Sequence, residues 1–204
     1  MMGLMDSFDE IKSSALKELA NIGISHVATA IGEIARERIS ISVPEFNTFT
    51  KKEFVNTKLQ QQVGAYFTVE GISELTETII LFQKQDAYEL MNKFVNTYQD
   101  TAIDSTKLSS DEKESIFLEI TTVISAAYFS AVDAMFNLKT NCGIPVINFE
   151  NGQLHDFICK RMRNDEAVSI KASFVAEHSK IKGEVFLIPD LNTINMFFNA
   201  IGVT

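Results

Sequence analysis

The two halves of the sequence repeat one succession of predicted elements, and this repeat constrains the fold more than any other feature. Each half begins with a long amphipathic helix, continues with strands and closes with a shorter helix. The first half predicts helix 8–36, strands 39–43, 62–70 and 77–82, and helix 86–96; the second predicts helix 111–136, strands 142–149, 167–177 and 183–188, and helix 192–201, with room for a short helix over 151–163.

Two such copies predict a mixed α/β (α+β) fold with pseudo-twofold symmetry, in which one shared β-sheet is covered by the two long helices. The repeats are expected at about 7–99 and 108–204, within a single domain, with the polar stretch 100–111 as their connector. Two independent domains are the alternative. That arrangement is less favoured, because each half would then depend on a three-stranded sheet in about 100 residues.

The first long helix carries a polar stripe. Ser14, Glu18, Asn21 and Ser25 are spaced four, three and four residues apart, so they fall on one narrow side of a helix. The opposite, apolar side is predicted to face the core and consists of Leu16, Leu19, Ala20, Val27, Ala30, Ile31 and Ile34. A carboxylate and a carboxamide are therefore expected side by side on the outer face, before a strand that Pro44 ends or bends.

The same stripe returns 101 residues later as Ser115, Glu119 and Thr122. Its predicted buried side consists of Phe117, Ile120, Ile124, Ala127, Tyr128, Ala131 and Met135. The second copy has a threonine in place of Asn21. An amide offers a donor and an acceptor in one plane, whereas a threonine hydroxyl is shorter and rotates, so Thr122 is not expected to replace the amide.

A polar stripe of this kind is most often a solvated helix face. Because the stripe is retained across an internal duplication, a functional surface is favoured over a solvated helix face. His26 stands five residues after Asn21 and points off the stripe, so a structural role suits it better than that of a general base. The sequence shows no metal-ligand spacing, catalytic triad or Gly-rich phosphate loop, so no metal or cofactor is expected on this chain.

Composition narrows the range of partners. The formal net charge of −9 and the pI near 4.9 argue against nucleic acid and against an anionic membrane, and favour a basic protein surface. Cys142 and Cys159 form no CxxC pair, and the stretch MMGLMDS is unlike an export leader, so a cytoplasmic protein with two buried thiols is expected. No apolar run is expected to span a bilayer.

The stripe and the proline after it resemble the CheC/CheX/FliY family of chemotaxis phosphatases. The family pattern is Asp or Ser, three residues, Glu, two residues, Asn, twenty-two residues and Pro, and Ser14, Glu18, Asn21 and Pro44 keep every spacing. ELANIG and SVP around these residues are also similar to the family. Length and the duplicated layout are closest to CheC.

The resemblance implies hydrolysis of the phosphoaspartate of the response regulator CheY. Glu18 would contact a basic group of the regulator and Asn21 would orient the attacking water, with Ser14 and Pro44 supporting the motif. The regulator would carry its own Mg²⁺, so this chain would bind none. Ser115, Glu119 and Thr122 would form a degenerate second site. The bulky residues Ile24, Ser25 and His26 depart from the small residues common there in the family.

Two other functions stay open. The chain could be a non-catalytic binding module for the phosphorylated regulator or for the receptor deamidase CheD, which the resemblance raises as a partner. It could also be a structural subunit such as a flagellar-switch protein. A homodimer formed through part of the Phe-rich sequence around Phe197 is a further expectation.

Overall fold

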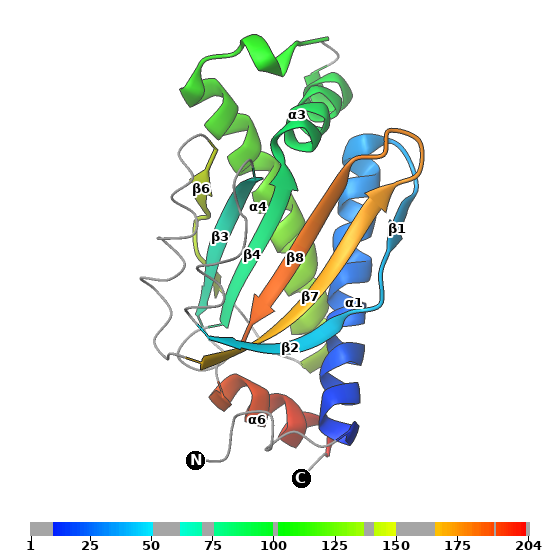
Figure 1. The fold of residues 1–204 in the computed structure, drawn as a ribbon, viewed down its shortest axis with the longest axis vertical. Helices are drawn as coiled ribbons and strands as arrows, with labels where there is room; N and C mark the ends of the chain where they lie inside the picture. Colours follow the sequence, from blue (N-terminus) through cyan, green and yellow to red (C-terminus); the bar gives the residue numbers. More distant parts are fainter. Residues whose placement is uncertain are drawn as a thin grey trace.

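The fold is built on one antiparallel sheet with two long helices against one face (Figure 1). The computed structural model describes residues 10–50, 62–70, 76–99, 102–136, 141–149, 166–189 and 191–202. The helices are α1 (Glu10–Ala35), α3 (Lys84–Gln99), α4 (Ser110–Phe136) and α6 (Leu191–Ile201), with the short 3-10 helix η2 (Ser105–Lys107). The strands are β1 (Ile39–Ile41), β2 (Glu45–Thr50), β3 (Gln62–Glu70), β4 (Thr76–Gln83), β5 (Asn141–Cys142), β6 (Val146–Asn148), β7 (Glu166–Ala176) and β8 (Lys182–Ile188).

Each half of the chain gives its first strands to the other half. The strand order is β1-β7-β8-β4-β3-β5, and β2 also pairs with β7 while β6 pairs with β3. The strands that follow α1 therefore lie beside the hairpin of the second half, and those that follow α4 lie beside the hairpin of the first. This exchange confirms the shared sheet predicted from the repeat. The repeat boundaries stay a prediction.

The register at the centre of the sheet is the one a twofold axis would give. Ile79 of β4 lies opposite Phe186 of β8, and Ile80 lies opposite Val185. In the aligned sequences TIILF (78–82) and EVFLI (184–188), Val185 and Phe186 are the counterparts of Ile79 and Ile80. The pseudo-twofold axis thus passes through the β4–β8 pair, which lies in the middle of the sheet.

The core lies between the sheet and the pair α1 and α4. The predicted apolar side of α1 is buried throughout. Phe82 meets Phe117 and Phe174 edge to face, with ring centroids 5.8 and 5.5 Å apart, so α4, β4 and β7 join in one cluster. Two residues of the predicted core side of α4 are not fully buried: Ala127 is partly buried, and Met135, next to the last residue of the helix, is 40% exposed.

Several element predictions needed correction. Residues 45–50 were not predicted as a strand, yet β2 follows Pro44, which bends the chain between β1 and β2. The strand predicted over 142–149 is two short strands separated by Gly143–Pro145. The connector contains η2, whose Ser105 amide donates to Asn92 Oδ1 at 2.9 Å. The short helix predicted over 151–163 and Cys159 lie outside the described residues.

α4 spans Ser110–Phe136, close to the predicted 111–136, but it is more apolar than expected. By length and composition, Ser110–Met135 would be able to cross a membrane, contrary to the expectation that no apolar run is long enough. Half of its most apolar window is buried inside the protein. Its start is fixed by a capping box, because the Ser109 amide donates to Glu112 Oε2 at 2.9 Å and the Glu112 amide donates to Ser109 Oγ at 3.4 Å.

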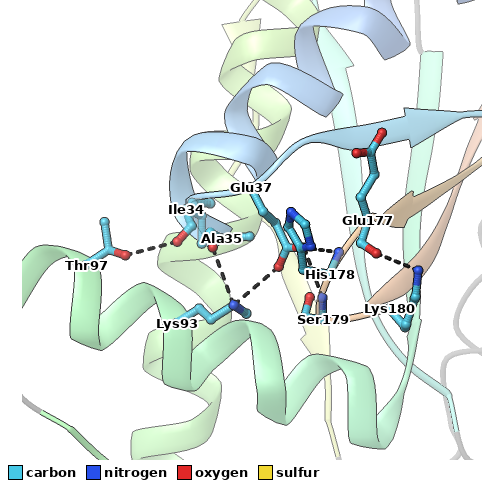
Figure 2. Close-up of polar contacts among 9 residues, drawn as sticks. All are labelled: Ile34, Ala35, Glu37, Lys93, Thr97, Glu177, His178, Ser179 and Lys180. Carbon is cyan, nitrogen blue, oxygen red and sulfur yellow. Dashed lines mark hydrogen bonds and ion pairs between the residues drawn. The ribbon is translucent and has the colours of Figure 1, made fainter.

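α1 ends in a left-handed residue and a buried carboxylate. Arg36 has a φ of 53°, and the Glu37 amide donates to the Gly32 carbonyl at 3.2 Å, which is the hydrogen bond of a Schellman motif. The Glu37 side chain is 3% exposed. Its Oε2 accepts the amides of His178 and Ser179 at 2.6 and 3.0 Å, and Lys93 Nζ lies 3.3 Å from its Oε1 (Figure 2). This carboxylate ties α1 to α3 and to the β7–β8 turn.

Burial raises the pKa of Glu37, but hydrogen bonds from Ser179 and His178 and the Lys93 ammonium outweigh it and lower the pKa from 4.5 to about 2. Because the folded-state pKa lies below the unfolded one, the carboxylate stabilises the fold fully above about pH 4.5, and that stabilisation is lost as pH falls toward 2. The difference corresponds to at most about 3 kcal/mol.

Glu37→Gln is expected to lower the free energy of unfolding by about 2 kcal/mol at pH 7, since an amide cannot keep the charge-assisted bonds. The loss relative to the parent protein should shrink between pH 5 and pH 2. Urea unfolding followed by circular dichroism at pH 7, 5, 4 and 3 measures both. Glu33→Gln, at an exposed position on α1, is the control. A stability difference independent of pH would contradict this role.

Gly23 allows α1 and α4 to approach closely. A Cβ built on Gly23 would lie 2.1 Å from Cε2 of the buried Tyr128 ring on α4, closer than any real contact. Burial also raises the pKa of the Tyr128 hydroxyl, so this side chain stays neutral. The glycine therefore sets the spacing of the two helices that carry the polar stripes.

Gly23→Ala should destabilise the protein by about 2 kcal/mol, although alanine favours helices, because the methyl group overpacks against Tyr128. Replacing Tyr128 with Leu in the same chain should recover part of that loss. A double-mutant cycle of Gly23→Ala and Tyr128→Leu by chemical denaturation measures the coupling. Additive effects would show that the close approach is not what makes this glycine important.

Candidate functional site

The first polar stripe lies along the outer side of α1. Ser14 and Glu18 are exposed, and Asn21 is half-buried. The Ser25 hydroxyl donates to the Asn21 carbonyl at 2.7 Å, so it is used by the helix backbone. Within the described residues, the side chains of Glu18 and Asn21 make no hydrogen bond or ion pair. A carboxylate and a carboxamide thus stand one turn apart on a rigid helix, available to an outside partner.

Pro44 is buried at the bend between β1 and β2, and both strands contact α1. The residues before it are held to β7, since the Ser42 amide donates to the Ser173 carbonyl at 2.8 Å and the Ser173 amide donates to Ser42 Oγ at 2.9 Å. Val43, directly before the proline, is 79% exposed. Pro44 therefore shapes the strand beside α1 and presents no polar group of its own.

The second stripe lies on α4 and differs in its chemistry. Ser115, Glu119 and Thr122 are all exposed. The Thr122 hydroxyl donates to the Leu118 carbonyl of its own helix at 2.7 Å, so its proton is directed at the backbone. This contact agrees with the expectation that Thr122 does not stand in for an amide.

The second half also repeats the proline. Pro145 follows Thr122 by the same 23 positions that separate Pro44 from Asn21, and it is buried as Pro44 is. Ile144 before it is 84% exposed, as Val43 is before Pro44. This equal spacing can be read directly from the sequence. The second copy therefore retains the whole pattern except the asparagine.

A small apolar hollow borders the first stripe, and sequence reasoning missed it. It has a volume of about 170 Å³ and lies between the first half of α1, the end of α4 and α6. Glu18 lines it together with residues that include Met135, Phe198 and Ile201. These side chains come from three distant parts of the sequence, so no local pattern could have placed them beside Glu18.

The other candidates have structural roles or lie apart. His26 is exposed, and the backbone amide of His178 donates to Glu37. No group of three or more His, Cys, Asp or Glu side chains that could hold a metal occurs within the part of the chain that the structure describes. The side chain of Cys142 lies outside the part of the chain that the structure describes, and so does the whole of His155.

Comparisons with known proteins agree on the fold. The family model described as the CheC-like family matches residues 11–48, which contain the first stripe and Pro44. No curated protein matches the chain. The structure is similar to FliY from Thermotoga maritima, with a TM-score of 0.70 and 11% identity over 97% of this chain and all of that one.

Two further solved structures have the same architecture. CheX from Desulfovibrio desulfuricans matches with a TM-score of 0.56 and 14% identity over 84% of this chain and 99% of its own. The FliM middle domain from H. pylori matches with a TM-score of 0.65 and 8% identity over 95% of this chain and 99% of its own. At these identities the structural likeness shows the fold alone, and the sequence likeness rests on residues 11–48.

Proposed function

We propose that this chain belongs to the CheC/CheX/FliY family and that it hydrolyses the phosphoaspartate of a CheY-type response regulator. The family premise is supported by the match over residues 11–48 and by the fold. The observation that carries the proposal is the pair Glu18 and Asn21. The two side chains are presented on the outer side of α1 at the family spacing and make no hydrogen bond or ion pair within the described residues. A chemotaxis-related role follows from the family, and a cytoplasmic location fits it.

The chemistry suits these two groups. Glu18 pairs with a basic group of the regulator and fixes the two proteins relative to each other. The Asn21 amide then accepts a hydrogen bond from a water molecule, or donates one to it, and holds its oxygen in line with the phosphorus. The water oxygen forms the new bond to phosphorus as the bond to the aspartate oxygen breaks. The aspartate carboxylate leaves, and the inorganic phosphate formed keeps both protons of the attacking water, which then equilibrate with solvent.

Little more is required of this chain. An acyl phosphate is already activated, and the regulator is expected to hold its own Mg²⁺, which would neutralise phosphoryl charge when bound. Positioning of water on a rigid helix is then the main contribution of the phosphatase. A site without a nucleophile, metal cluster or phosphate loop is consistent with such a reaction.

Asn21→Ala should lower kcat for phosphate release from the phosphorylated regulator about 100-fold, because the water loses its orientation. Glu18→Ala should lower kcat/KM at least tenfold through weaker docking. Both are measured by continuous phosphate release with regulator, Mg²⁺ and a small-molecule phosphodonor. Glu33→Ala, an exposed acid on the same helix, is the matched control and should stay within twofold of the parent. Full activity in Asn21→Ala would refute the site.

The second stripe offers a gain-of-function test. Thr122→Asn, made in the Asn21→Ala protein, should restore measurable phosphate release, because Ser115, Glu119 and Pro145 already keep the required spacing. Thr122→Ala in the otherwise unchanged protein should leave the rate within twofold. No recovery by Thr122→Asn, in a protein shown to be folded by circular dichroism, would mean that the α4 surface no longer receives the regulator.

A second candidate is a binding module without catalysis, for the phosphorylated regulator or for CheD. The observation that favours it is the FliM likeness, since a structure with this fold is described as a FliG–FliM complex from H. pylori. The same arrangement of helices can therefore belong to a protein that assembles with another. Tight binding of phosphorylated regulator with no acceleration of phosphate release would support this candidate over the phosphatase.

A further inference from the structure

The apolar hollow beside Glu18, called here the α6 groove, is lined by residues of α1, α4 and α6. In Figure 1, α6 lies beside the N-terminal end of α1. Its walls are apolar side chains of α1, Met135 at the end of α4, and Phe198 and Ile201 of α6. Among the described residues, Glu18 is the one charged side chain that lines it. The groove is therefore an apolar surface with a single carboxylate at its border.

Two large apolar side chains in its walls are open to solvent. Met135 is 40% exposed and Ile201 is 46% exposed. The Lys12 ammonium lies 5.7 Å from the Phe198 ring centroid, which adds a cation at one end of the α6 wall. Large apolar side chains left open beside an unengaged carboxylate are the features of a protein-docking surface.

The size of the groove limits its occupant. A volume of about 170 Å³ is smaller than the roughly 300–1,000 Å³ typical of small-molecule sites, so a drug-sized ligand would not fit. One large apolar side chain suits it better. Because Glu18 borders the groove, any partner that brings a basic group to this carboxylate must place its neighbouring side chains over the groove.

We propose that the α6 groove receives an apolar side chain of the phosphorylated regulator, next to the basic group that pairs with Glu18. The inference rests on the proposed function for the identity of the partner. The charge of this chain favours a basic partner surface, and the apolar walls favour an uncharged neighbour to that basic group. α6 thereby sets which regulator binds, whereas Asn21 sets how fast the bound phosphoryl group reacts.

The test separates docking from catalysis. Ile201→Gln and Met135→Gln replace exposed apolar walls with neutral polar side chains, so neither variant changes the charge near Glu18. Each should raise the Kd for the Mg²⁺- and beryllofluoride-loaded receiver domain of the regulator encoded in the same genome by about tenfold. Leu191→Gln, on α6 outside the groove and 48% exposed, is the matched control and should stay within twofold. Isothermal titration calorimetry gives the Kd.

Steady-state assays supply the second measurement. If the groove docks the regulator, Ile201→Gln raises KM for the phosphorylated regulator while kcat stays within threefold, the reverse of the effect expected of Asn21→Ala. Unchanged Kd and KM in both groove variants would overturn the proposal even with an active phosphatase. Weaker binding in both variants would uphold the groove even if no hydrolysis is found, so the two proposals fail separately.

Light scattering on the same proteins tests another occupant. If Ile201→Gln turns a dimer of this chain into a monomer and leaves regulator binding unchanged, the groove holds a second copy and the proposal is wrong. A monomer in every variant, together with the tenfold loss of regulator affinity, supports it.

Discussion

The exchange of strands between the two halves is the constraint on which the rest of the structure depends. Among the described strands, β1 and β2 pair with β7 of the second half, and β5 and β6 pair with β3 of the first half. Neither half could form its sheet alone, so the chain folds as one body with the β4–β8 pair at its centre. The same exchange anchors the chain immediately after α1 and α4, and it thereby fixes the two helices that carry the polar stripes.

The length of each periodic stretch decided how much of the fold could be predicted from the sequence. The long helices and the four hairpin strands have strong patterns, and their predicted positions differ from the observed ones by few residues. β2 was missed because EFNTFT is short and only weakly alternating, and the strand predicted over 142–149 is broken by Gly143–Pro145 because a proline cannot donate to a ladder. Which strands pair with each other could not be predicted from the sequence, because the exchange of strands between the halves depends on the three-dimensional path of the chain and not on local pattern.

The stripe residues could be found from spacing alone, because Ser14, Glu18 and Asn21 share one helix. Their surroundings could not. Met135 was predicted as a core residue from its helical position, yet it is 40% exposed and lines the hollow beside Glu18. Ile201 lines the same hollow from the other end of the chain. Glu37 gave no sign in the sequence of its buried role, since a lone acid after a helix is ordinarily solvated.

The same fold occurs in FliY, CheX and FliM, and within this chain it presents two related polar stripes that can be compared with each other. α1 and α4 are equally rigid, equally supported by buried prolines and equally marked by a serine and a glutamate. They differ at one position, where an amide unengaged within the described residues faces out from α1 and a threonine hydroxyl on α4 bonds to its own helix. Under the proposed function the phosphoryl donor is already activated, so one oriented amide on α1 would separate hydrolysis from binding alone. Partner choice must then come from the surface around the pair, and on α1 that surface is apolar on the side of α6.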